Sequence, residues 1–325
     1  MKQNESVESL ELKSCKLMFA VPAATTAMEE MLCTNSTLRS LHLEGCEIKA
    51  AVASALSKAL HINHSLTDLT LNEVEDGISA VLSSLAASQS DVRNLKLSHC
   101  QVSNADEPFI RAILVHNTIK SLDLTSNYLG PDAAVNLFYA LGDNTSLEKL
   151  VLSSSTCLGE GDTEAFPTVI EAALSKNQTL KVLQLDRCSL PYPAVEAIAN
   201  ALANGSGLEE LNMESSKLSS VGVHKIFIAL QTNNTLKKLI LKDDITLNNA
   251  IADDLNRMVA HNSSLMALTI KFNSISSITG FIKALYTNMS LTKIGISGLD
   301  VAQLNAVNFD RIRKRMNIIA MDLCY

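Results

Sequence analysis

The sequence lacks tryptophan altogether, and only 4% of its 325 residues are aromatic. Leucine, isoleucine, valine and alanine must therefore fill the core, and 47% of the residues are hydrophobic, which is ample for one. No apolar run reaches the roughly 20 residues that a membrane-spanning helix needs. The polar start of the chain also lacks the pattern of a secretory signal peptide. We therefore expect no membrane partner and a cytosolic location, in the protein's own cell or in a host cell.

Positive charge and paired cysteines are also scarce. The chain has 27 Lys and Arg against 34 Asp and Glu, a net charge of −7, whereas nucleic-acid binding depends largely on a cationic surface. None of the seven cysteines forms the Cys-x-x-Cys spacing of a zinc site. The Gly-x-Gly at 159–161 lacks the rest of a phosphate-binding loop. We expect no nucleic-acid partner, no metal and no cofactor.

What the chain does contain is a repeat. Residues 180–190, LKVLQLDRCSL, read Leu-x-x-Leu-x-Leu-x-x-Cys-x-Leu, and successive copies start 26 to 33 residues apart. Such a period indicates a solenoid in which each coil contacts only its neighbours. The sequence predicts one solenoid over residues 1–325, with about eleven repeats and a short C-terminal capping strand. The copies begin at Val7, Leu38, Leu66, Val92, Ile119, Leu147, Leu180, Leu208, Leu236, Leu265 and Leu291, and the shortened last copy at Ile318.

Each copy has two halves with different periods. The Leu-x-Leu alternation, as in Leu122–Leu124, has period two and predicts a half-buried strand. Residues 131–141 instead place apolar side chains at helical spacing, and Pro131 suits a first helical turn. Repetition of strand, turn, helix and turn predicts parallel strands on one side of the solenoid and helices on the other.

This pattern resembles the leucine-rich repeat family, and specifically its ribonuclease-inhibitor-like subtype, over about residues 7–325. The resemblance implies an α/β fold, a curved horseshoe-shaped solenoid with a parallel sheet on the concave face and helices on the convex face. It also implies a protein that binds other proteins on the concave face and its rims. Similar solenoids occur in enzyme inhibitors, innate immune receptors, Ran GTPase-activating proteins, tropomodulin-like cappers and bacterial effectors.

Two kinds of polar residue recur at fixed positions of the repeat. Cysteine occupies the ninth position of several copies, where we expect reduced, buried thiols that behave as small hydrophobic residues: Cys15, Cys46, Cys100 and Cys188. Asparagine precedes the first Leu by three residues in most copies, always within a glycosylation sequon. Its recurrence at one structural position favours backbone hydrogen bonding at a tight turn over glycosylation: Asn35, Asn63, Asn144, Asn177, Asn233, Asn262 and Asn288.

The histidines do not indicate catalysis. His61, His116 and His261 fall at the ends of expected helices, where a partial positive charge suits the helix dipole. His42 and His99 are expected on the concave side but two coils apart, roughly 9–10 Å, which is too far to share a proton or a metal ion. No Arg on a strand segment matches a GTPase-activating motif. We therefore expect a non-enzymatic protein.

The binding face is expected at positions three, five and seven of the repeat, which point away from the leucine core. Along these positions apolar residues appear only in later repeats, and charge changes from acidic (Glu11, Glu44) to basic (Lys238, Lys293). Interface centres favour apolar anchors inside a polar rim. We predict Ile240 and Phe272 as anchors within a protein-binding set comprising Val151, Val182, Gln184, Asp186, Arg187, Asn212, Glu214, Ile240, Lys242, Lys271 and Phe272.

Alternatives remain open at this point. The apolar side chains could be isolated surface residues, which are common. The longest repeat carries an insertion at residues 153–167 that is either a contact loop or a tolerated insertion. The leading function is a protein-binding module, an adaptor or inhibitor that is a monomer when free, and a bacterial effector is one form it could take. The alternatives are a regulator of an enzyme, such as a GTPase-activating protein, and the repeat region of a larger receptor.

Overall fold

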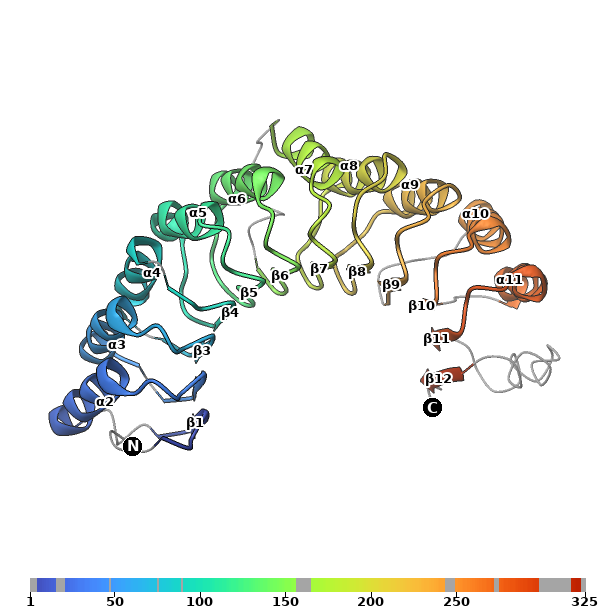
Figure 1. Ribbon diagram of the computed structural model, residues 1–325. Helices are drawn as coiled ribbons and strands as arrows, with labels where there is room; N and C mark the ends of the chain where they lie inside the picture. The colour runs from blue at the N-terminus through green and yellow to red at the C-terminus, as the bar shows by residue number, and fades with distance from the viewer. Residues whose placement is uncertain are drawn as a thin grey trace. The chain divides into compact units, whose positions relative to one another are not determined.

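The computed structural model describes residues 5–15, 21–46, 48–74, 76–88, 90–155, 165–242, 249–271, 275–297 and 317–322. The chain divides into two compact units, residues 1–161 (unit 1) and residues 162–325 (unit 2). In each unit the strands form one layer and the helices another (Figure 1). The prediction that residues 1–325 form one solenoid domain stays a prediction.

Unit 1 alternates strands and helices in chain order. Its strands pair in parallel with their sequence neighbours, in the order β1 to β6, and Leu partners Leu in the register, as in Leu41↔Leu69. The elements are β1 (Ser9–Lys13), α2 (Pro22–Thr34), β2 (Ser40–Glu44), α3 (Ala50–Ile62), β3 (Asp68–Asn72), α4 (Ile78–Ala87), β4 (Asn94–Ser98), η1 (Asn104–Asp106), α5 (Glu107–Val115), β5 (Ser121–Asp123), α6 (Pro131–Asp143) and β6 (Lys149–Val151).

Unit 2 repeats the same alternation. Its strands also pair in parallel in chain order, and the last strand pairs with β11, as expected of a capping strand. The elements are α7 (Ala165–Lys176), β7 (Val182–Gln184), α8 (Tyr192–Ala203), β8 (Glu210–Asn212), α9 (Ser220–Leu230), β9 (Lys238–Leu241), α10 (Asn249–His261), β10 (Ala267–Lys271), α11 (Ile275–Thr287), β11 (Lys293–Ser297) and β12 (Asn317–Asp322).

The core of each unit lies between its strand layer and its helix layer. In β2, for example, Leu41 and Leu43 at positions four and six are fully buried, while His42 between them is partly exposed. The few aromatic side chains that are fully buried, Phe138, Phe227 and Phe281, come from helices. The alternation predicted for the strands is therefore confirmed. Among the described residues no helix is both long enough and apolar enough to cross a membrane.

The repeated asparagines form buried turns. All seven are between 3% and 7% exposed. Each side-chain oxygen accepts hydrogen bonds from backbone N–H groups two and three residues ahead; that of Asn233, for example, accepts from Thr235 N at 3.1 Å and from Leu236 N at 2.9 Å. The Asn233 amide also donates to the Leu202 carbonyl of the preceding coil, at 2.8 Å. The structural interpretation of the sequons is confirmed, because a glycan on these side chains would require the turn to open.

The ninth position carries hydrogen-bond donors in many coils rather than merely small side chains. In five coils the ninth side chain donates to the carbonyl of the position-six Leu of the preceding coil, whereas Val74 fills the same position without a donor. Cysteine, asparagine and serine all make this bond: Cys46 to Leu12 O (3.3 Å), Cys100 to Leu71 O (3.3 Å), Asn127 to Leu97 O (2.6 Å), Ser155 to Leu124 O (3.2 Å) and Ser216 to Leu185 O (2.6 Å). The change from Cys to Asn or Ser therefore conserves the donor.

The thiol prediction is right for three cysteines and wrong for one. Cys46, Cys100 and Cys188 are buried and unbonded to one another, whereas Cys15 is partly exposed. Cys15 belongs to the coil that starts at Val7, whose strand leucines Leu10 and Leu12 are also partly exposed. Burial raises the pKa of the Cys100 thiol to about 12.

Candidate functional site

The predicted binding residues of unit 2 lie side by side on its strand face. Position five forms the row Gln184, Asn212, Ile240 and Thr269, in which each residue is the register partner of the next. All four are partly exposed, as are the neighbouring Asp186 and Glu214 at position seven. The parallel register thus brings residues about 28 positions apart in the sequence into one continuous surface.

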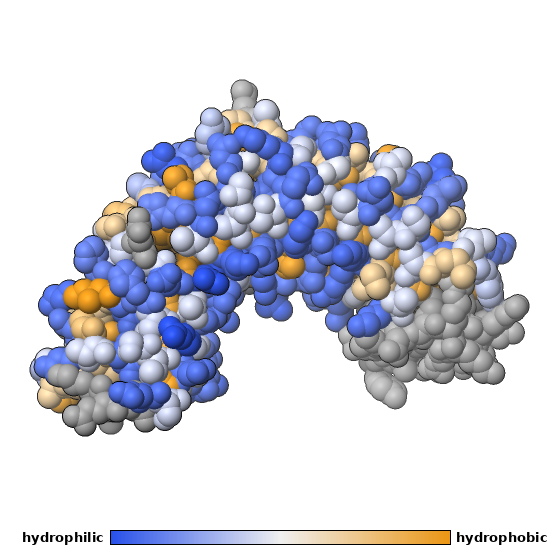
Figure 2. Space-filling model, viewed as in Figure 1, coloured by the Kyte–Doolittle hydropathy of each residue, from blue (hydrophilic) through white to orange (hydrophobic). Residues whose placement is uncertain are grey.

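Large apolar side chains occur at two places on this face, at position three (Val182) and at position five (Ile240). Val182 on β7 and Ile240 on β9 are both partly exposed on the strand face. Between and beside them the side chains are polar, and the surface along the strand layer is mainly hydrophilic (Figure 2). Val182 and Ile240 are therefore apolar points within a polar surface, which is the pattern of an interface anchor.

Polar contacts between coils hold the rest of the face in place. The Lys238 ammonium lies 2.8 Å from the Glu210 carboxylate, and the side chains are 43% and 24% exposed. The Asn212 amide donates to the Asp186 carboxylate at 3.1 Å, and its oxygen accepts from Glu214 N at 3.0 Å. Each of these bonds is weak while it is exposed, but together they restrict the rotamers that the face presents to a partner.

Arg187 occupies a different kind of position from the rest of the predicted set. It is the eighth residue of its copy, has φ of 59°, and its backbone N–H donates to Glu214 O at 2.8 Å. The described eighth positions share this left-handed conformation, with φ between 53° and 60°: Ser14, Gly45, Glu73, His99, Ser126, Ser154, Arg187 and Ser215. The left-handed turn ends the alternation, so the exposed Arg187 side chain lies at the edge of the strand face.

Two apolar members of the predicted binding set differ from the rest: Val151 is nearly buried, and the predicted anchor Phe272 lies outside the described residues. Val151 lies on β6 of unit 1 and is only 4% exposed, and the following outward residue, Ser153, is 7% exposed. Val151 therefore offers almost no surface to a partner, because an outward direction is not the same as exposure. Phe272 lies outside the described residues, as do most of the insertion at 153–167 and the basic residues Arg311–Arg315. Lys242 and Lys271 are partly exposed at the position-seven edge.

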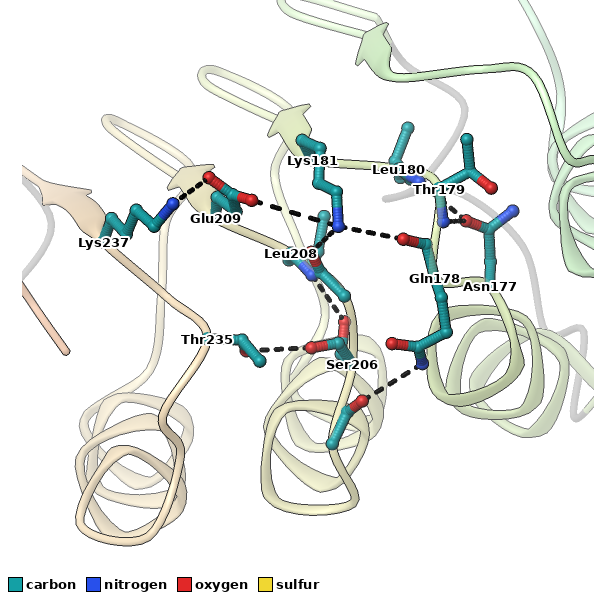
Figure 3. A network of polar contacts seen from close by, with 12 residues as sticks. Asn177, Gln178, Thr179, Leu180, Lys181, Ser206, Leu208, Glu209, Thr235 and Lys237 are labelled. Atoms are coloured by element: carbon teal, nitrogen blue, oxygen red, sulfur yellow. Dashed lines mark hydrogen bonds and ion pairs between the residues drawn. The ribbon is translucent and has the colours of Figure 1, made fainter.

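A second network runs along the rim formed by the turns between helix and strand (Figure 3). The Glu209 carboxylate lies 2.6 Å from the Lys237 ammonium and 3.9 Å from that of Lys181. The Lys181 ammonium also donates to the carbonyls of Gln178 (2.9 Å) and Gly207 (3.2 Å). Gly207 approaches Gln178 so closely that a Cβ would lie 2.8 Å from its Cα. Position two of the repeat therefore carries its own ladder of charge pairs.

The helix layer of unit 2 holds charge clusters that the sequence pattern did not indicate. The Asp254 side chain on α10 is 3% exposed, contacts the His224 ring on α9, and accepts from the Arg257 guanidinium at 2.5 Å. On α8, hydrogen bonds from Lys225 and Tyr192 lower the pKa of the Glu196 carboxyl. The i, i+3 spacing of Asp254 and Arg257 and the i, i+4 spacing of Tyr192 and Glu196 could have been found in the sequence, whereas the contacts between helices could not. Among the described residues, no three His, Cys, Asp or Glu side chains are placed to hold a metal ion.

Comparisons with known proteins agree with this geometry. A leucine-rich repeat family model matches residues 34–57. The chain is 24% identical over 305 residues to mouse NACHT, LRR and PYD domains-containing protein 14, covering 84% of this chain and 30% of that protein. It is 25% identical over 277 residues to pig ribonuclease inhibitor, covering 76% of this chain and 60% of the inhibitor. The chain thus spans less than two thirds of the length of these relatives.

A solved structure shows the same fold. The yeast Rad7 and Elc1 complex contains a chain with a TM-score of 0.57 and 13% identity to this one, covering 92% of this chain and 72% of that one. Parallel strands in one layer, helices in another and the matching repeat define an α/β leucine-rich repeat solenoid. Its repeats and fold are those of the leucine-rich repeat class and resemble the ribonuclease-inhibitor-like subtype.

Proposed function

We propose that the chain is a non-enzymatic protein-binding module, an adaptor or inhibitor, that holds a protein partner on the strand face of unit 2. The observation that carries this proposal is the pair of partly exposed apolar side chains, Val182 and Ile240, whose neighbours Gln184, Glu210, Asn212 and Lys238 on the face are polar. Burial of a few apolar anchors contributes most of the free energy of binding at such interfaces. The similarity to ribonuclease inhibitor supports an inhibitory form of this function.

The rigidity of the face favours binding. Asp186 and Asn212 are held by one hydrogen bond, and Glu210 and Lys238 by one ion pair, so a partner meets side chains that are already ordered. Binding then loses little conformational entropy at these positions. Lys242 directly follows β9, which carries the anchor Ile240, and Lys271 ends the adjacent strand β10. Both would mainly raise the association rate of an acidic partner. In this proposal Arg187, Gln184 and Glu214 form the polar rim of the interface.

The test is affinity capture with matched variants, followed by quantitative mass spectrometry. Ile240→Asp places a charge on the strand face, and Ile228→Asp places the same charge on the exposed side of α9, where Ile228 is 44% exposed. We expect Ile240→Asp to weaken capture of the specific partner by about tenfold or more. Ile228→Asp should leave capture unchanged, and neither variant should change the free energy of unfolding by more than about 0.5 kcal/mol.

The opposite outcome would move the site. If Ile240→Asp is neutral and Glu44→Ala in unit 1 abolishes capture, the wrong unit has been chosen. Stoichiometric binding without stimulated turnover supports the module. Stimulation of a partner enzyme by catalytic amounts of the chain supports the alternative function, a regulator such as a GTPase-activating protein.

A third form of the proposal is the repeat region of a larger receptor. The observation that favours it is the match to only 30% of the mouse NACHT, LRR and PYD domains-containing protein. The binding face serves equally well in that context. A cytosolic location, a monomeric free state and the lack of nucleic-acid and membrane partners belong to the same proposal, and size-exclusion chromatography with light scattering tests the monomer.

A further inference from the structure

Two positions on the turn rim are polar in nearly every coil. The first is position two of the repeat, occupied by Glu8, Arg39, Thr67, Arg93, Lys120, Glu148, Lys181, Glu209, Lys237 and Thr292. The second directly follows the buried asparagine and is occupied by Ser36, His64, Thr145, Gln178, Asn234 and Ser263. Each row has one exception: Met266 at position two and Met289 after Asn288. The two exceptions fall in consecutive coils.

The structure places these coils side by side. Met266 O accepts hydrogen bonds from Thr292 N at 2.9 Å and from Lys293 N at 3.0 Å. The segment that follows Met289 therefore pairs with Met266, the residue just before β10. Rim side chains of adjacent coils reach one another, as the Lys181, Glu209 and Lys237 contacts show (Figure 3). That ladder of charge pairs reaches Lys237, and the next position-two residue is Met266.

A third exposed apolar side chain, Tyr286, lies three residues before Met289 in the same coil. Tyr286, in the last turn of α11, stands two residues before Asn288, where other coils have Cys33, His61, Gly142, Ser175, Gln231 and Ala260. Met289 is 83% exposed, Met266 48% and Tyr286 46%. We refer to Met266, Tyr286 and Met289 as the rim patch. Methionine is flexible and polarizable, and it is over-represented on surfaces that adapt to peptides.

The charge around the rim patch indicates what it could bind. Residues 265–297 contain Lys271, Lys283 and Lys293 but no Asp or Glu, although the whole chain has a net charge of −7. Lys283 and Lys293 are exposed, and Lys283 lies one helical turn before Tyr286. We propose that the rim patch is a second interaction surface, distinct from the strand face, for an acidic peptide segment of a protein whose apolar side chains cover the methionines.

The repeat itself supplies a conservative test variant. Met266→Thr introduces the residue type that another coil has at position two, Thr67. Met289→Ser introduces the residue type that another coil has after its asparagine, Ser263. The double variant should therefore fold with an unchanged melting temperature. Tyr139→Ser on α6, where Tyr139 is 70% exposed, removes an exposed apolar side chain elsewhere and serves as the matched control.

The probe is a random peptide library displayed on phage and selected on the full chain, with the double variant used for counter-selection. We expect enriched peptides that combine Asp or Glu with large apolar residues. A fluorescent copy of such a peptide should bind the double variant about tenfold more weakly, and should bind Tyr139→Ser and Ile240→Asp as it binds the unaltered chain. Retained binding to Ile240→Asp separates this site from the strand face.

Methionine methyl resonances locate the bound peptide directly. In the chain labelled with ¹³C at the methionine methyl groups, titration should shift the signals of Met266 and Met289. The signals of Met213 and Met258, both fully buried, should not move. No peptide enrichment, enrichment of basic peptides, or equal binding to the double variant would overturn the proposal. A second result would also overturn it: acidic peptides do not bind, and the double variant loses the binding of the chain to vesicles of phosphatidylserine and phosphatidylcholine. The rim patch would then contact a membrane surface.

Discussion

The buried polar rows and the strand face are built from the same repeat, but they differ in how freely the residue type varies from coil to coil. At the turn, an asparagine recurs in most coils and its amide contacts the preceding coil, as Asn262 does with Leu230 O at 2.7 Å. On the strand face, by contrast, position five runs through Gln184, Asn212 and Ile240 without any shared property. A residue that must satisfy a buried backbone group has few substitutes, whereas an exposed residue is free to vary with the partner.

The ninth-position row lies between these two cases. Its residue type changes among Cys, Asn and Ser, but the donated hydrogen bond is kept. What these coils share is thus an atom with a proton to donate at one place, while Val74 fills that place with an apolar side chain. This comparison predicts graded effects of substitution on stability.

The largest effect is expected at a buried asparagine. Asn233→Ala removes the acceptor for Thr235 N and Leu236 N and the donor to Leu202 O, and it should lower the free energy of unfolding by about 3 kcal/mol. The adjacent Asn234 is exposed, so Asn234→Ala should cost less than about 0.5 kcal/mol. Urea unfolding of both variants measures the difference, and equal costs would contradict the role assigned to the turn.

A smaller effect is expected in the ninth-position row. Ser216 is fully buried and donates to Leu185 O at 2.6 Å, so Ser216→Ala should destabilise the protein by about 2 kcal/mol. Ser216→Cys should recover much of this loss, because cysteine makes the same bond at Cys46 and Cys100. If urea unfolding shows Ser216→Cys to be as damaging as Ser216→Ala, packing rather than the donor controls this position.

The smallest effect concerns pH. Burial raises the pKa of the Cys100 thiol from 9.0 to about 12, so the folded state holds this proton more tightly than the unfolded state. The resulting stabilisation is complete below pH 9 and is lost as the pH rises from 9 towards 12. Cys100→Ser keeps a donor for Leu71 O but does not titrate in this range.

The measurement is the difference in unfolding free energy between the unaltered chain and Cys100→Ser. Relative to Cys100→Ser, the unaltered chain should lose about 1 kcal/mol of unfolding free energy between roughly pH 8 and pH 10. Other alkaline effects are common to both proteins and cancel. A difference that does not depend on pH would show that the Cys100 thiol is not buried in solution.

The sequence by itself determined the architecture, because in a solenoid each coil contacts only its neighbours and a fixed period therefore specifies packing. Leu41 and Leu43 could be assigned to the core, and Asn233 to a turn, from their recurrence. The outward rows of the strand face followed from strand alternation alone, which is why Val182, Asn212 and Ile240 were placed correctly on one surface.

Tertiary structure alone decided which atoms meet across coils and which outward residues reach solvent. Val151 follows the alternation yet is buried, and Cys15 occupies the ladder position yet is partly exposed, because burial depends on what covers a residue as well as on its direction. The donor role of Cys46 required a carbonyl 34 residues earlier in the chain, Leu12 O. The closeness of Met266 and Met289 likewise depends on the pairing of two coils, which no single repeat contains.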